Sequence, residues 1–250
     1  MKLKHELKIL LLQIREDEET MLEEFYEFVQ FSGLREDQFT KLNTFKTTAF
    51  PPNIIDDYDA LFVGGSSDAS VLYAEDYIFV PHCKALLHYC YGNNIPVLAS
   101  CFGFQVAVEA LGGKVIEDKA NMEMGMYPIH LHPEAKNDPL LHDYPDEFWA
   151  ISGHKERAHK IPLDCVLLAS SELCPYHIIK FIDKPFYCFQ FHPEVDRKDL
   201  VTRLTRYQMR YLENDDVLQQ IIDASIHETT HANKLVKDFV DRVILPHQIK

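Results

Sequence analysis

A cysteine between an apolar run and a predicted helix is the residue of this sequence that most favours covalent chemistry. Cys101 stands in the stretch Ser100-Cys101-Phe102-Gly103. The amino end of a helix lowers the pKa of a thiol, and a strand-to-helix elbow exposes the sulfur to a ligand. A buried structural cysteine is the alternative interpretation of Cys101, and it is the one adopted for the five other cysteines.

A histidine with a glutamate two positions later is the best candidate for a base. A thiolate nucleophile needs such a partner, and the chain contains 13 histidines. His192 stands out because Glu194 follows it at the end of an apolar run. Residues two apart in an extended segment point to the same side, so Glu194 would fix the tautomer of the imidazole. A surface histidine beside an exposed glutamate is the alternative.

Two glycines after another apolar run supply a third candidate feature. Gly64 and Gly65 follow residues 59–63. Backbone N–H groups of such a loop stabilise an oxyanion when they point toward it. The alternative interpretation is that Gly64 and Gly65 only form a turn.

These groups lie at the ends of predicted buried strands. Continuous apolar runs of this length are typical of parallel strands, and their alternation with helices indicates a doubly wound sheet. The runs are residues 8–14, 59–63, 95–100 and 186–191, and the predicted helices after the second and third runs cover residues 75–91 and 102–111. Ligands bind at the carboxyl ends of such strands. A parallel placement of residues 186–191 therefore predicts that His192 lies beside Cys101.

The later part of the chain changes in pattern. Between residues 114 and 191, short β candidates separated by turns predict an antiparallel or mixed extension, and helices return from residue 197. The predicted fold is a three-layer α/β fold with a doubly wound, mostly parallel sheet, a short antiparallel extension and a helical tail. We expect one domain over residues 1–212 and a helical extension over residues 213–250 that packs on it.

Together the three features resemble the class I (triad) glutamine amidotransferases, whose fold is flavodoxin-like. The resemblance spans about residues 8–210 and is carried by Gly64-Gly65, by Cys101-Phe102-Gly103-Phe104-Gln105 with Gly112-Gly113 after the helix, and by Phe191-His192-Pro193-Glu194. It implies that Cys101 is the nucleophile, His192 the general base and acid, and Glu194 its orienting partner. It also implies an oxyanion hole formed by the backbone N–H groups of Gly65 and Phe102.

The same resemblance implies where the substrate binds. Substrate contacts are expected at Gln105 and Gly64 and, through a looser match, at His154, Lys155 and Glu156. The implied reaction is hydrolysis of a γ-glutamyl amide through a γ-glutamyl thioester. The substrate would be glutamine or another γ-glutamyl small molecule, and neither a cofactor nor a metal is expected.

Departures from the family pattern leave the biological role open. The sequence has no GxxxxGK[ST] phosphate loop, and the loop after Gly65 lacks the proline common in synthase-linked members. The chain therefore looks most similar to a stand-alone branch, like the glutaminase domains of GMP synthases and the γ-glutamyl peptidases. Three roles remain: a glutaminase that supplies ammonia to a separate synthase, a γ-glutamyl peptide hydrolase, or a catalytically silent binding module. The sequence also leaves open whether the protein forms a homodimer.

Composition excludes some partners. With 39 acidic and 25 basic residues, the net charge of −14 speaks against binding nucleic acid or an anionic membrane. No apolar run is long enough to cross a bilayer, and six cysteines without a CxxC pair predict a cytoplasmic protein. Basic residues gather between positions 197 and 210, where they either neutralise their own domain or dock a partner. A metal site at His130, His132 and His142 is disfavoured, because no Cys or acidic ligand accompanies them.

Overall fold

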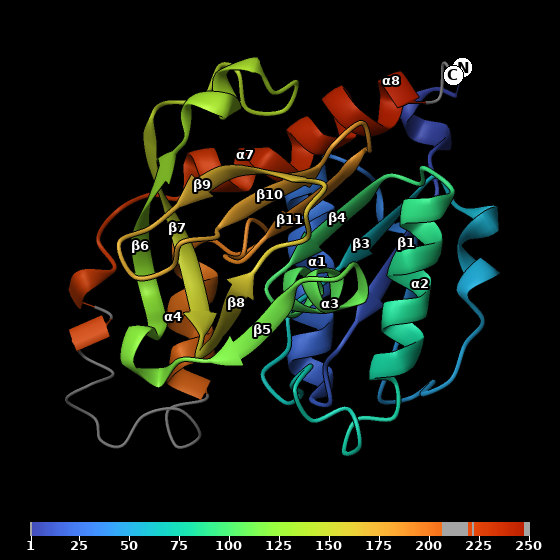
Figure 1. Ribbon diagram of the computed structural model, residues 1–250, viewed down its shortest axis with the longest axis horizontal. Coiled ribbons are helices and arrows are strands. Elements are labelled where there is room, and N and C mark those ends of the chain that lie inside the picture. Colours follow the sequence, from blue (N-terminus) through green and yellow to red (C-terminus); the bar gives the residue numbers. More distant parts are fainter. Residues whose placement is uncertain (1, 207–219, 222, 248–250) are drawn as a thin grey trace.

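The computed structural model describes residues 2–206, 220, 221 and 223–247, which form an α/β structure (Figure 1). The strands are β1 (Ile9–Gln13), β2 (Phe39–Asn43), β3 (Ala60–Val63), β4 (Val97–Ser100), β5 (Lys114–Glu117), β6 (Glu123–Leu131), β7 (Glu147–His154), β8 (Glu156–Lys160), β9 (Cys165–Ser170), β10 (Ile178–Phe181) and β11 (Phe186–Phe189). The helices are α1 (Glu18–Ser32), α2 (Val80–Gly92), α3 (Phe102–Ala110), α4 (Arg197–Arg206), α7 (Thr230–Phe239) and α8 (Leu245–His247).

The main sheet of the described residues has the order β2-β1-β3-β4-β11-β10-β9-β6-β7. Neighbours from β2 to β11 are parallel, and neighbours from β11 to β7 are antiparallel. In Figure 1, β1 and β3 lie to the right and β6 and β7 to the left. Strands β5 and β8 form a separate antiparallel pair. This arrangement confirms the predicted mostly parallel sheet with an antiparallel extension.

Alternation along the central strands divides the core into two layers. Successive side chains of a strand point to opposite faces of the sheet. In β1, Ile9 and Leu11 join one cluster of buried side chains, whereas Leu10 and Leu12 join the other. Helices α1 and α7 cover the first face, and α2 and α3 cover the second. The continuous apolar run of β1 is therefore explained by burial on both sides.

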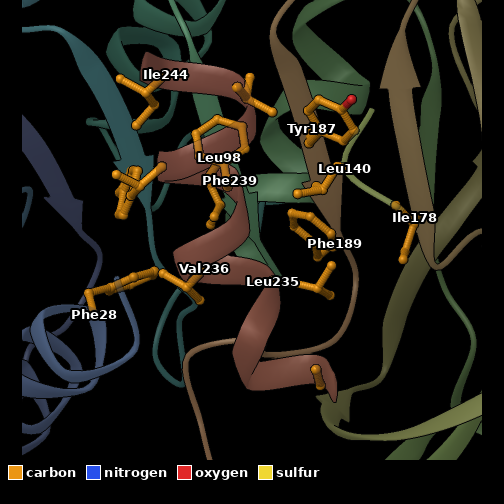
Figure 2. Packing of buried hydrophobic residues seen from close by; sticks show 14 of the residues in the cluster. Phe28, Leu98, Leu140, Ile178, Tyr187, Phe189, Leu235, Val236, Phe239 and Ile244 are labelled. Atoms are coloured by element: carbon orange, nitrogen blue, oxygen red, sulfur yellow. The ribbon is translucent and has the colours of Figure 1, made fainter. Parts of the chain in front are cut away.

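Helix α7 closes the first face. Figure 2 shows Leu235, Val236 and Phe239 of this helix between Phe28 of α1 and Phe189 of β11. All five side chains are buried in one cluster. Helix α7 thus belongs to the same core as the central strands. None of the described helices is both long and apolar enough to cross a lipid bilayer.

The structure differs from the sequence predictions at two elements. Helix α2 begins at Val80, several residues after the predicted start, and Pro81 occupies its first turn, where a missing N–H costs nothing. Strand β8 was not predicted, because only Lys155 separates it from β7. The predicted domain boundary after residue 212, and parts of the helices predicted over residues 197–212 and 215–226, fall outside the described residues.

Candidate active site

Cys101 occupies a strained elbow between β4 and α3. Its backbone has φ 49° and ψ −100°, a combination that L-residues rarely adopt. The Cys101 N–H donates to Phe189 O at 2.8 Å, which ties the elbow to β11. Only 3% of Cys101 is exposed, yet the residue lines the cleft described below. The fold therefore holds a thiol at the amino end of a helix, as the sequence predicts.

Gly103 allows this helix to start close to the sheet. A Cβ atom at Gly103 would lie 2.9 Å from both Cβ and the carbonyl oxygen of Val63 in β3. The Gly103 N–H also donates to Gly64 O at 3.3 Å. The glycine is required by the close approach of α3 to β3, and it links the elbow to the Gly64–Gly65 loop.

His192 and Glu194 lie on the segment after β11, next to this elbow. Strand β11 is parallel to β4, with Phe189 paired to Ser100, so both chains leave the sheet at the same edge. His192 Nδ1 lies 2.7 Å from Glu194 Oε1. The His192 N–H donates to Ile151 O at 2.8 Å, which holds the segment against β7.

The surroundings of His192 favour its protonated form. Burial alone would lower its pKa, but the charges of Glu194 and Cys101 and hydrogen bonds to both raise the pKa to about 10. Burial would likewise raise the pKa of Glu194, yet His192 holds it below its usual value. An imidazolium between a carboxylate and a sulfur is the arrangement that stabilises a thiolate.

Gly65 lies against both reactive side chains. A Cβ atom there would be 2.5 Å from Cε1 of His192 and 3.4 Å from Cβ of Cys101. Only a residue without a side chain fits at this position without displacing the imidazole. The structure thus brings Gly65, Cys101 and His192 together, as the sequence predicts.

A buried ion pair supports the glycine loop from behind. Arg15, two residues after the end of β1, donates through Nε to Glu24 Oε1 at 2.9 Å, and Gln13 Nε2 donates to Glu24 Oε2 at 3.2 Å. Side-chain exposure is 4% for Arg15 and 0% for Glu24. A Cβ atom at Gly64 would collide with the Glu24 carboxylate. This pair is not among the predicted features, although Arg15 stands directly after the apolar run of residues 8–14.

An open cleft of about 1020 Å³ lies over Cys101. Four residues predicted to contact a substrate line it, namely Gln105, His154, Lys155 and Glu156. Gln105 Nε2 donates to Glu156 O at 2.8 Å, which fixes the two relative to each other. Gly64 is not among the described lining residues and instead faces Glu24. Lys119 and Arg203 also line the cleft, as do the acidic residues Glu16 and Asp68.

The model of the class-I glutamine amidotransferase family matches residues 31–210. The chain belongs to this family. A GMP synthase (glutamine-hydrolyzing) from Streptococcus mutans is 33% identical over 159 residues, which cover 63% of this chain and 28% of that protein. A GMP synthase (glutamine-hydrolyzing) from Thermosipho africanus is 34% identical over 130 residues, 52% of this chain and 23% of the relative. The match thus spans about a quarter of these relatives.

Solved structures of similar fold extend over nearly the whole chain. A glutamine amidotransferase from Thermotoga maritima superposes with a TM-score of 0.76 at 20% identity, covering 94% of this chain and 98% of the other. A glutamine amidotransferase from Methylobacillus flagellatus gives a TM-score of 0.70 at 19% identity, covering 95% of this chain and 94% of the other. At these identities the likeness supports the amidotransferase fold.

Arg203 of α4 turns toward its own amidotransferase domain. Its guanidinium pairs with Glu27 and lies 3.9 Å from Glu23 Oε2, both on α1. Arg197 Nε donates to the carbonyl oxygen of Ser225. Arg203 therefore contacts acidic side chains of its own chain, whereas Arg197 binds a backbone carbonyl group.

The histidines considered for a metal site each have a partner of their own. His130 Nδ1 lies 3.2 Å from Glu147, His132 Nε2 lies 3.0 Å from Ser170 Oγ, and His142 Nδ1 lies 3.2 Å from Pro139 O. They do not converge on one point. A different group does converge: His154, Cys174 and His177 bring their ligand atoms within 4.8 Å of one another.

Proposed function

We propose that the protein hydrolyses a γ-glutamyl amide with Cys101 as nucleophile, His192 as general base and acid, and Glu194 as the residue that orients His192. The observation that carries this proposal is the strained Cys101 elbow beside an imidazole whose Nδ1 lies 2.7 Å from a buried carboxylate. With Nδ1 engaged by Glu194, Nε2 is the nitrogen that exchanges a proton with the reacting groups.

The reaction proceeds in two halves. The Cys101 sulfur bonds to the γ-carbonyl carbon, and the carbonyl oxygen takes the negative charge. Collapse breaks the C–N bond, and the leaving nitrogen takes a proton from His192 Nε2, which produces ammonia or an amine and a γ-glutamyl thioester. Water then attacks the thioester and gives a proton to Nε2. The C–S bond breaks, which releases glutamate and restores the thiolate.

The oxyanion is bound by the backbone N–H groups of Gly65 and Phe102. Phe102 is the first residue of α3, whose first N–H groups have no partner within the helix. The fit of Gly65 against Cys101 and His192 supports its assignment. Two such donors in a water-poor site stabilise the developing charge more than they would in water.

The glutamyl part of the substrate binds along Gln105, Lys155 and Glu156, and His154 forms the floor of this site. Gly64, in the Gly64–Gly65 loop, faces Glu24 and does not line the cleft. Lys155 offers a cation for the α-carboxylate, and Glu156 offers a carboxylate for the α-ammonium group. Glu156 and Gln105 are both 5% exposed and bonded to each other, so they form a prepared wall rather than a mobile surface.

A release assay tests the proposal. Glutamate is measured after incubation with glutamine, glutathione and simple γ-glutamyl amides, with the native protein and Cys101→Ala in parallel. We expect turnover of at least one substrate by the native protein and none by the variant. Equal rates for the two proteins would contradict the nucleophile assignment.

A stand-alone γ-glutamyl peptide hydrolase is the second candidate, and the cleft favours it. Its volume of about 1020 Å³ is at the upper end of the usual range for ligand pockets and exceeds what free glutamine needs. Lys119 would suit a substrate with a second carboxylate. Hydrolysis of glutathione without any added protein would support this candidate.

An ammonia-accepting synthase is the partner expected under the first candidate. The relatives called GMP synthase are several times longer than the matched segment, which agrees with a glutaminase that works beside a synthase activity. Glutaminase activity that appears only on addition of such a partner would support it. Absence of turnover with every substrate, with and without a partner, would leave the silent binding module as the best account.

A further inference from the structure

Four buried side chains meet beneath the cleft, and only one of them, His154, also belongs to the proposed substrate site. Glu123 begins β6 and pairs across the hairpin with His154 at the end of β7, while Cys174 and His177 lie on the connection from β9 to β10. Glu123, Cys174 and His177 have no exposed surface, and His154 is 5% exposed. Three separate segments of the chain thus converge on one point inside the protein.

The ligand atoms of this group lie close together. Glu123 Oε2 is 3.1 Å from His154 Nε2 and 2.9 Å from His177 Nε2. The nitrogens of His154 and His177 and the sulfur of Cys174 all lie within 4.8 Å of one another. A tetrahedral zinc ion with bonds of about 2.0–2.3 Å separates its ligands by roughly 3.5 Å, so small side-chain rotations would complete the shell.

His177 supplies an independent observation that points to a ligand. Among the described residues, Nδ1 of His177 has no hydrogen-bond partner, and Nε2 faces the Glu123 carboxylate at 2.9 Å. An unsatisfied buried polar group is costly, and histidines of this kind are rare without a function. A metal ion bound beside Glu123 would be within reach of Nε2.

Charge balance favours a divalent cation over an empty cluster. Cys174 and Glu123 are both fully buried. A thiolate and a carboxylate together carry two negative charges, which a divalent ion neutralises while both histidines stay neutral. Two imidazoles, a thiolate and a carboxylate are donors that zinc accepts, and binding releases the thiol proton to solvent.

We propose that His154, Cys174 and His177, together with Glu123, form a site for a divalent zinc-type metal ion. The ion forms a bond to each donor atom. The Cys174 thiol releases its proton to solvent when its sulfur binds the ion, and no electron is transferred. The metal joins the β6–β7 hairpin to the β9–β10 connection and fixes the ring of His154 at the cleft floor. The metal ion takes no part in the hydrolysis, so the proposal of a metal site does not depend on the proposed activity.

Cobalt is the probe for the test, because its spectrum reports the ligands directly. The full-length Cys101→Ala protein is used, so that metal bound by the Cys101 thiol does not contribute. We expect one equivalent of Co²⁺ per chain, a sulfur-to-cobalt charge-transfer band and the strong visible bands of tetrahedral cobalt. Zinc should displace the cobalt. X-ray absorption spectroscopy of the zinc-bound Cys101→Ala protein should then show one sulfur ligand. This measurement needs no substitution within the cluster.

Substitutions at two positions then assign the ligands. In the same background, Cys174→Ser should abolish the charge-transfer band, and His177→Gln should weaken zinc affinity at least tenfold. Cys165→Ser, which changes a cysteine outside the cluster, should leave both unchanged. The proposal is overturned if the parent protein binds no metal, if its spectrum lacks a sulfur band, or if Cys165→Ser and Cys174→Ser behave alike. In each of those cases the four residues are only a hydrogen-bonded support for His154.

Discussion

Nδ1 of His192 lies 2.7 Å from Oε1 of Glu194, and both side chains are buried on the segment that follows β11. The carboxylate fixes the ring and supports its positive charge. Glu194→Gln retains the shape but loses the charge, so we expect kcat to fall about 10²–10⁴-fold with the fold intact. Steady-state kinetics and circular dichroism measure the two effects.

A histidine–glutamate pair on the surface provides the matched control. His130 Nδ1 lies 3.2 Å from Glu147 Oε2, and both side chains are about half exposed. Glu147→Gln should leave kcat unchanged. If Glu147→Gln lost as much activity as Glu194→Gln, the loss would come from removing a negative charge anywhere on the protein and not from the orientation of His192.

Gly65 should tolerate no side chain. Its Cβ would lie 2.5 Å from the imidazole of His192, so Gly65→Ala should displace the ring and lower kcat/KM at least a hundredfold. Gly92→Ala, at the end of α2 with open space around its Cβ, is the control and should be fully active. Near-native activity of Gly65→Ala would exclude the proposed packing of this loop.

The pKa of His192 should differ from that of an ordinary histidine. Nuclear magnetic resonance titration of the imidazole should give a pKa near 10, and the value should fall in Glu194→Gln because a principal cause of the increase is removed. A ring that titrates near 6.5 in the native protein would contradict the ion-paired arrangement.

The same shift gives stability a defined dependence on pH. A pKa that is higher in the folded state means that the folded protein holds the proton more tightly. The contribution of His192 to stability is therefore fully present below about pH 6.5 and is lost as the pH rises through about 10. Urea unfolding of the native protein and Glu194→Gln should show a difference in unfolding free energy that shrinks over this window. A difference that grows with pH would have the wrong sign.

The buried pair Arg15–Glu24 should be essential for stability. Arg15→Met leaves the Glu24 carboxylate buried without its cation, and we expect the free energy of unfolding to fall by about 3 kcal/mol. Lys46→Met breaks an exposed pair with Glu18 and should leave the unfolding curve unchanged. Equal stability of Arg15→Met and the native protein would refute a supporting role for the pair beneath the Gly64–Gly65 loop.

The central part of the fold and the candidate triad were predictable because their signals are local. The apolar runs of β1, β3, β4 and β11 are buried on both faces, so their composition alone identifies them. Cys101 directly follows one run, and His192 and Glu194 stand two apart after another. The parallel pairing of β4 with β11 is enough to bring them together.

The convergence of the four residues beneath the cleft could not be predicted in this way. His154 is expected at the substrate from the family resemblance, but its proximity to Glu123 depends on the register of the β6–β7 hairpin. Cys174 and His177 stand in a connection without periodicity. The Arg15–Glu24 pair was not predicted either. Glu24 lies on the buried side of α1, whose many charged residues suggest an exposed helix.

Covalent labelling tests the central claim most directly. A glutamine analogue with a chloroketone in place of the amide is offered to the native protein, which is then digested and analysed by mass spectrometry. We expect one adduct per chain on the peptide containing Cys101, slowed by excess substrate and reduced in Glu194→Gln. Labelling at another cysteine at the same rate, with Cys101 unmodified and glutamate release intact, would contradict the account.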